Sequence, residues 1–191
     1  MNIFGSVALV TGANRGIGRA LVEALIGKGA RRIYATARNV ATLQELTTSY
    51  PGVVENIELD ITDHSAVAKA ATARRDVDLL INNAGISNLT GLIEAKTLDN
   101  ARAEMETNYF GTLAMCRSFA PILRSNGGGC INIHSPASSN SNITNNHRCS
   151  SHVLPGDRIL DSFARKKSYK NIFSPALSDM RNRRSNNYSF A

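Results

Sequence analysis

The chain has 191 residues, a hydrophobic content of 42% and a formal net charge of +7. This length accommodates one α/β domain, and the apolar content excludes a wholly disordered protein. The excess of basic residues is local. Residues 1–134 carry 13 basic and 12 acidic residues, whereas residues 135–191 carry nine and three. The positive charge therefore belongs to the C-terminal part and is a poor guide to what residues 1–134 bind.

Three cysteines and a plain amino terminus bear on cellular location. Cys116, Cys130 and Cys149 form no CxxC pair and have no histidine at metal-ligand spacing, which predicts reduced thiols and no metal site. The apolar run near the amino terminus follows no basic stretch and is too short for a signal sequence or a membrane span. We therefore expect a cytoplasmic protein without a membrane anchor.

Apolar runs and amphipathic segments alternate along the first 134 residues. Short runs typical of buried strands occupy 7–12, 31–38, 53–62, 77–85 and 130–134. Segments with helical periodicity occupy 14–30, 41–50, 64–75, 97–107 and 108–124. Strict alternation with short connections predicts an α/β fold, a Rossmann-like doubly wound parallel sheet of about five strands.

The stretch TGANRGIG (11–18) lies between the first expected strand and its helix. Glycines at 12, 16 and 18 permit a sharp turn and a close approach to a diphosphate, which the first N–H groups of the helix would face. The spacing differs from G-x-G-x-x-G, so a tight turn that needs glycine for its own geometry is the alternative interpretation.

Two arginines bear on which nucleotide would bind. Arg38 lies 20 residues after Gly18, where an acidic residue would accept the ribose 2′-hydroxyl of NAD and an arginine suits the 2′-phosphate of NADP. Arg15 is a second base inside the glycine-rich stretch. The alternative is that both arginines are solvated at the ends of a strand and a turn. The pattern favours NADP(H).

With T-G-x-x-x-G-I-G at 11–18 and NNAG at 82–85, the chain resembles the short-chain dehydrogenase/reductase family from about Val7 to Ser135. The resemblance implies an oxidoreductase that transfers hydride between NADP(H) and a small carbonyl or alcohol substrate. It also implies that Asn108 holds a proton-relay water and that Ser135 hydrogen-bonds the reacting carbonyl. The cofactor contacts expected from the glycine-rich stretch and the resemblance are Thr11, Gly12, Asn14, Arg15, Gly16, Ile17, Gly18, Arg38, Asp60, Ile61, Asn83, Ala84 and Gly85.

The family's catalytic tyrosine and lysine are not found. The resemblance places Tyr-x-x-x-Lys about 13 residues after the serine, but the residue 13 after Ser135 is Arg148, and His152 follows four later. The pattern occurs nowhere after Ser135, and a family member would continue with further strands and helices. A positioned general acid typically contributes about 10²–10⁴-fold to a rate. We therefore expect weak NADPH binding, preferred over NADH, and negligible carbonyl reduction.

Residues 136–191 form a polar, basic tail that we expect to be disordered or loosely packed, after an incomplete NADP-binding Rossmann-type domain over 1–135. One account of the tail is a displaced reading frame, which would leave the domain truncated. A second is a non-catalytic paralogue that keeps a cofactor-binding module. A third is a basic tail that binds nucleic acid or an acidic partner. The composition favours a solvated, disordered terminus over nucleic-acid binding. Without the family's later elements, we expect the homo-oligomer interface to be compromised. We also expect the fifth strand to become an exposed edge or to be covered only by the tail.

Overall fold

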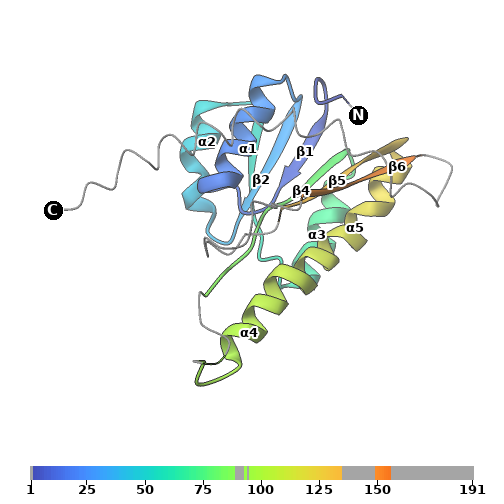
Figure 1. Cartoon of the computed structure of the whole chain (residues 1–191). Helices are drawn as coiled ribbons and strands as arrows, with labels where there is room; N and C mark the ends of the chain where they lie inside the picture. The colour runs from blue at the N-terminus through green and yellow to red at the C-terminus, as the bar shows by residue number, and fades with distance from the viewer. Residues whose placement is uncertain (1, 89–92, 94, 135–148, 156–191) are drawn as a thin grey trace.

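The fold is built on one six-stranded sheet, seen in a computed structural model that describes residues 2–88, 93, 95–134 and 149–155 (Figure 1). The strands run in the order β3-β2-β1-β4-β5-β6, and the first five are parallel. Their bounds are β1 (Val7–Val10), β2 (Arg32–Ala37), β3 (Val54–Glu58), β4 (Leu79–Asn82), β5 (Gly128–His134) and β6 (Cys149–Pro155).

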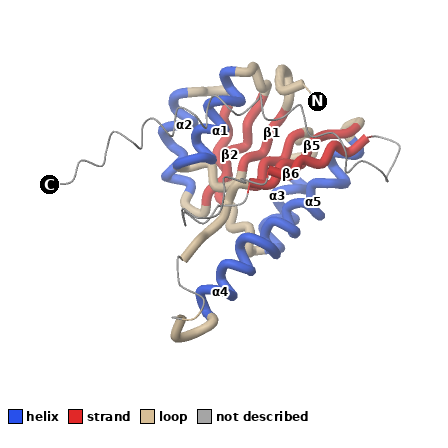
Figure 2. The backbone as a smooth tube through the Cα atoms, viewed as in Figure 1, coloured by secondary structure: helices blue, strands red, loops and turns tan. Residues whose placement is uncertain are grey.

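Helices cover both faces of this sheet (Figure 2). Helices α1 (Gly16–Gly27) and α2 (Gln44–Ser49), with the 3₁₀ turn η1 (Val40–Leu43), pack on one face. Helices α3 (His64–Ala73) and α5 (Thr112–Ser125) pack on the other. Helix α4 (Asp99–Glu104) continues through a π-helical segment, η2 (Met105–Gly111), into α5. The predicted doubly wound α/β architecture is confirmed.

Side chains alternate between two cores because successive residues of a strand point to opposite faces. The first core combines strand residues such as Val10, Ile33 and Ile81 with Leu21, Val22 and Leu25 of α1. The second combines residues such as Leu9, Tyr34 and Leu80 with Met115, Phe119 and Leu123 of α5. All four residues of β1 are 0% exposed, which explains why its sequence reads as an unbroken apolar run.

The structure corrects two sequence-based expectations. The tail beyond residue 135 was predicted to be irregular, yet its β6 pairs antiparallel with β5, from Gly128 opposite Pro155 to His134 opposite Cys149. A parallel edge strand presents unpaired backbone groups, and β6 satisfies those of β5. The two helices expected at 97–107 and 108–124 are instead one continuous helical stretch, because the π segment adds a residue to the turn without ending it.

Two expected absences can be examined in the described part of the chain. No helix there is long and apolar enough to cross a membrane. Likewise, no group of three or more His, Cys, Asp or Glu side chains is gathered in a metal-binding arrangement within the described ranges. The remainder of the basic tail, at 135–148 and 156–191, lies outside the described residues, so the expectations for it stay predictions.

Candidate functional site

The candidate site lies at the carboxyl ends of β1 and β4, where the strand order reverses. Strand β1 pairs with β2 on one side and with β4 on the other, and the helices that follow β1 and β4 lie on opposite faces. In open α/β sheets this reversal leaves a crevice in which ligands bind. The sequence-predicted loops at 11–18 and 83–85 both begin at this crevice.

The glycine-rich loop is shaped by three glycines that could not carry a side chain without strain or collision. Gly12 and Gly16 have φ of +63° and +56°, a backbone region that L-residues rarely adopt. A Cβ on Gly12 would lie 3.0 Å from Cα of Ala84, and one on Gly18 would collide with the carbonyl oxygen of Gly12. Glycine at 12 and 18 therefore lets the loop pack against the β4 turn and against the start of α1.

The first turn of α1 is open to an anion. Its N-cap residue, Arg15, is extended and gives no side-chain cap, and the first turn contains no acidic residue. A Cβ added at Gly16 would meet nothing within 4 Å. Unpaired N–H groups and the positive end of the helix dipole favour a phosphate at such a position. The loop therefore has the space and the donors to hold a diphosphate.

Thr11 and Asn83 join β1 to β4 at the floor of the crevice. The buried Thr11 Oγ1 accepts hydrogen bonds from the backbone N–H groups of Asn83 and Ala84, both at 2.9 Å. Asn83 Nδ2 donates back to Thr11 O at 2.9 Å and to Gly12 O at 3.1 Å. These four bonds fix the glycine-rich loop against the NNAG turn. Thr11 and Asn83 thus act by shaping the loops.

Asn108 lies in the π segment and holds the chain that leaves the NNAG turn. Ile86 N donates to Asn108 Oδ1 at 2.9 Å, and Asn108 Nδ2 donates to Ile86 O at 2.7 Å. Both polar groups of the side chain are engaged by one backbone unit, so the structure presents Asn108 as a positioning residue. Its expected role in holding a relay water stays a prediction.

The β3 end of the crevice contains Asp60 and Ile61. Asp60 Oδ1 accepts from the backbone N–H of Thr62 at 2.9 Å and from its hydroxyl at 2.8 Å, which fixes the turn after β3. Ile61 is 4% exposed and packs against Gly111, where an added Cβ would lie 2.9 Å from Ile61 Cγ1. The Ile61 side chain is therefore a core residue, and only its backbone remains for a cofactor contact.

The two arginines predicted to select the cofactor are both exposed. Arg15 opens α1, and Arg38 follows directly after the last residue of β2. Next to Arg38, Asn39 caps η1 by accepting from the backbone N–H of Ala41 at 3.0 Å. Asn14 precedes α1, Ile17 lies in its first turn, and Gly85 lies in the loop after β4. Ser135 lies outside the described residues.

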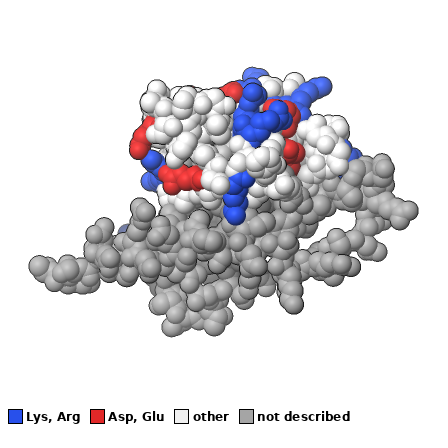
Figure 3. Space-filling view, turned by 90° about the horizontal axis from the view of Figure 1, so that it is seen from above, with Lys and Arg blue, Asp and Glu red and all other residues white. Residues whose placement is uncertain are grey.

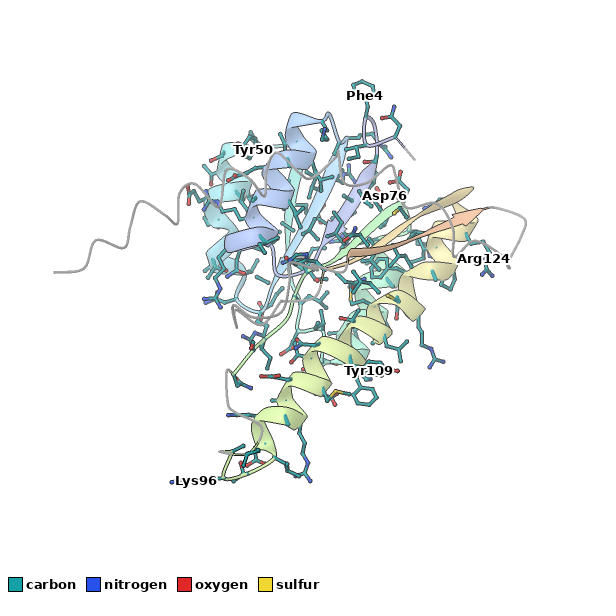
Figure 4. All side chains as sticks on the ribbon, viewed as in Figure 1. Phe4, Tyr50, Asp76, Lys96, Tyr109 and Arg124 are labelled. Atoms are coloured by element: carbon teal, nitrogen blue, oxygen red, sulfur yellow. The ribbon has the colours of Figure 1, made fainter. Side chains whose placement is uncertain are left out.

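Figure 4 shows how the two ends of the sheet differ. Tyr109, in the π segment, lies at the end where the strands finish and is 56% exposed. Asp76 lies at the opposite end, just before β4. There Asp76 accepts a hydrogen bond from the hydroxyl of Tyr34 at 3.0 Å and pairs with Arg32 at 3.6 Å. This second polar cluster is therefore remote from the candidate site and belongs to the framework.

Some residues that shape the site were not predicted from the sequence. Ile86 and Gly111 contribute through their backbone and through the lack of a side chain, and neither leaves a pattern in the sequence. Arg19 pairs with Glu45 of α2 as well as with Glu23 on its own helix. Only the second pair, four residues apart on a helix, has a sequence signal.

Comparison with known proteins identifies the family. The sequence model of the short chain dehydrogenase family matches residues 6–152, about three quarters of the chain. The chain belongs to the short-chain dehydrogenase family. Among curated relatives of this chain, D-erythrulose reductase of Gallus gallus is 35% identical over 136 residues, covering 70% of this chain and 54% of the relative. L-xylulose reductase of Mesocricetus auratus is 33% identical over 157 residues, covering 78% and 61%.

Solved structures agree with this placement. A short-chain dehydrogenase from Burkholderia cenocepacia, in complex with NADP, is 50% identical with a TM-score of 0.64, covering 69% of this chain and 53% of that one. A metagenomic short-chain oxidoreductase in complex with NADP is 30% identical with a TM-score of 0.64, covering 72% and 65%. The chain spans about half the length of the curated relatives that it matches.

Proposed function

We propose that this chain binds NADP(H), with the ribose 2′-phosphate held by Arg15 and Arg38. The observation that carries the proposal is the placement of two exposed arginines on the two loops that border the crevice, after β1 and after β2. A charge-assisted contact to phosphate contributes about 1.5–3 kcal/mol, which is enough for tenfold discrimination or better. The NADP bound by the Burkholderia cenocepacia and metagenomic relatives supports this choice.

The loop geometry fits the rest of a dinucleotide. Gly16 leaves open space at the uncapped start of α1, where backbone N–H groups would receive the diphosphate. Asp60, at the end of β3, would contact the adenine, while Asn83, Ala84 and Gly85 would lie along the cofactor. Thr11 would hold that turn in place through its two accepted hydrogen bonds.

The reaction class follows from the family: hydride transfer between NADP(H) and a carbonyl or alcohol group of a small molecule. The bound cofactor would supply the hydride, so the protein must position the substrate and supply a proton. Ser135 is the residue expected to hydrogen-bond the substrate oxygen. Asn108 fixes the backbone at Ile86, in the loop after β4. Catalysis by the family also needs a tyrosine whose pKa is lowered by a neighbouring lysine.

We propose that this 191-residue chain catalyses negligible carbonyl reduction, because no Tyr-x-x-x-Lys pattern follows Ser135. A non-catalytic NADP-binding module is the alternative function. Steady-state turnover of NADPH with a panel of small ketones and ketoses tests this point. Turnover above about 1 s⁻¹, the low end for ordinary enzymes, would contradict it.

The role of Arg38 is tested by the variant Arg38→Asp. We expect the ratio of NADPH to NADH affinity to fall at least about tenfold, because the substitution replaces the cation with a group that repels the 2′-phosphate. Lys69→Asp is the matched control, since it makes the same change of charge at an exposed position of α3, on the other face of the sheet. A ratio that is unchanged in Arg38→Asp would contradict the assignment.

On the described part of the face shown in Figure 3, basic side chains lie next to acidic ones, and no function in nucleic-acid binding is proposed. Cytoplasmic location, the loss of the family's homo-oligomer interface and the origin of the tail stay predictions.

A further inference from the structure

Arg19 is bound by two carboxylates from two different helices. Its guanidinium donates to Glu45 of α2 through Nη1 at 2.8 Å and Nη2 at 2.9 Å, a bidentate pair. Its Nε donates to Glu23, one turn later on α1, at 3.1 Å. A bidentate arginine–carboxylate pair fixes both distance and orientation between the elements that carry it.

The two helices joined in this way lead directly into the segments that carry the proposed 2′-phosphate ligands. Arg19 lies one turn after Arg15, which opens α1. Glu45 is the second residue of α2, which follows η1 and, before it, Arg38. Helices α1 and α2 lie side by side on the same face of the sheet (Figures 1 and 2). The pair therefore spans from one arginine-bearing segment to the other.

Few side chains are buried at the outer ends of these two segments. A backbone hydrogen bond from Ala13 N to Thr36 O, at 2.9 Å, joins the loop after β1 to β2 itself. Leu43 and Leu46 anchor η1 and α2 in the core, and Leu21 and Val22 anchor α1. The residues that open α1 or precede α2 are instead exposed, namely Arg15, Gly16, Arg38, Asn39, Ala41 and Thr42. The Arg19–Glu45 pair bridges the helices close to these exposed residues.

We propose that Arg19 and Glu45 are positioning residues that set the spacing between Arg15 and Arg38, and so determine the preference for NADP(H) over NAD(H). This inference rests on the proposed function. Neither residue needs to touch the cofactor, because Arg19 is engaged by its two carboxylates. A pair with side chains 34% and 71% exposed contributes little to global stability, so we expect its effect in the selectivity of the site.

The test compares Arg19→Gln with Glu45→Gln in the full chain, with the affinities for NADPH and NADH measured by titration calorimetry. Each variant breaks the bridge, but they change the net charge beside the site in opposite directions: Arg19→Gln leaves Glu45 and Glu23 without their cation, whereas Glu45→Gln leaves Arg19 paired with Glu23 alone. We expect both to lower the NADPH-to-NADH affinity ratio about three- to tenfold. Glu23→Gln is the matched control, because it removes only the contact within α1, and we expect a ratio within twofold of the parent. The charge-swapped variant Arg19→Glu/Glu45→Arg should recover most of the ratio.

Three results of the titration would overturn the inference. The single variants could stay within twofold of the parent, they could shift the ratio in opposite directions, which indicates simple electrostatics, or the swapped variant could be no better than the single ones.

Hydrogen exchange of the ligand-free chain tests the spacing role without any nucleotide, so it distinguishes failure of this inference from failure of the proposed function. We expect amides at 14–19 and 38–43 to exchange faster in both single variants than in Glu23→Gln, and unchanged exchange would overturn the spacing role. A parent that prefers neither nucleotide contradicts the proposed function, and the exchange result then decides the spacing role on its own.

Discussion

Asn108 and the backbone of Ile86 form a closed pair of hydrogen bonds, 2.9 Å and 2.7 Å long, between the π segment and the loop after β4. The same π segment packs against the β3 turn, where Gly111 contacts Ile61. One helical segment therefore holds the loops after two different strands. It fixes two sides of the crevice relative to each other.

Asn108→Ala should lower the free energy of unfolding by about 1–3 kcal/mol, because it leaves the N–H and carbonyl of Ile86 without their partner in a partly buried place. Urea unfolding followed by circular dichroism measures this loss. Glu106→Ala, an exposed position in the same π segment, is the control and should change stability by less than about 0.5 kcal/mol. Equal effects of the two substitutions would show that the Asn108 amide does not fix the loop.

Thr11→Val should cost about 1–3 kcal/mol, because the N–H groups of Asn83 and Ala84 lose the hydroxyl oxygen that accepts from both. Valine keeps the shape of threonine, so lost hydrogen bonding is the main change. Thr11→Ser keeps the hydroxyl and removes only a methyl group, at a cost of about 1 kcal/mol. Guanidinium unfolding of the three proteins compares these effects. A serine variant as unstable as the valine variant would contradict the proposed role of the hydroxyl.

Gly18→Ala should prevent nucleotide binding and destabilise the chain by about 1–3 kcal/mol or more, since the new Cβ collides with the carbonyl oxygen of Gly12. Gly27, at the other end of α1, has nothing within 4 Å of an added Cβ. Gly27→Ala should therefore stabilise the helix by up to about 1 kcal/mol. Thermal unfolding with and without NADPH tests both. Normal nucleotide binding by Gly18→Ala would contradict the close packing of loop and helix.

Asp78→Asn should make stability less dependent on pH. Burial raises the pKa of Asp78, although its carboxylate accepts from the backbone N–H of Val7 at 3.1 Å. A folded-state pKa above the unfolded one means that ionisation weakens the fold. Protonated Asp78 therefore makes its full contribution to the free energy of unfolding at a pH below the unfolded-state pKa, which is near 4. This contribution is lost as the pH rises through the folded-state pKa. The asparagine variant should match the parent near pH 3.5 and be more stable at pH 7. Parallel melting curves across this range would contradict the account.

The sequence was sufficient to predict the five parallel strands and the position of the crevice, because the buried strands read as apolar runs and the glycines lie at fixed places between strand and helix. It did not predict contacts made by the backbone, such as Asn108 with Ile86, or close packing made by the absence of a side chain, as at Gly111. Strand β6 was not predicted because its sequence, CSSHVLP, has little apolar alternation. The strand forms by pairing with the edge of β5, a contact that the sequence pattern does not reveal. Ile61 is expected among the cofactor contacts, and that stays a prediction; its side chain lies in the core, so the contact would be made by its backbone.

The central claim is that the crevice selects NADP(H) through its two arginines. Titration of the full chain with NADPH and then with NADH, by the quenching or enhancement of nicotinamide fluorescence, tests it most directly. We predict binding of both, with NADPH favoured at least about tenfold, which corresponds to about 1.4 kcal/mol. Equal affinities, or tighter binding of NADH, would contradict the claim. Arg15 and Arg38 would then be solvated residues at the ends of a loop and a strand, with no part in cofactor selection.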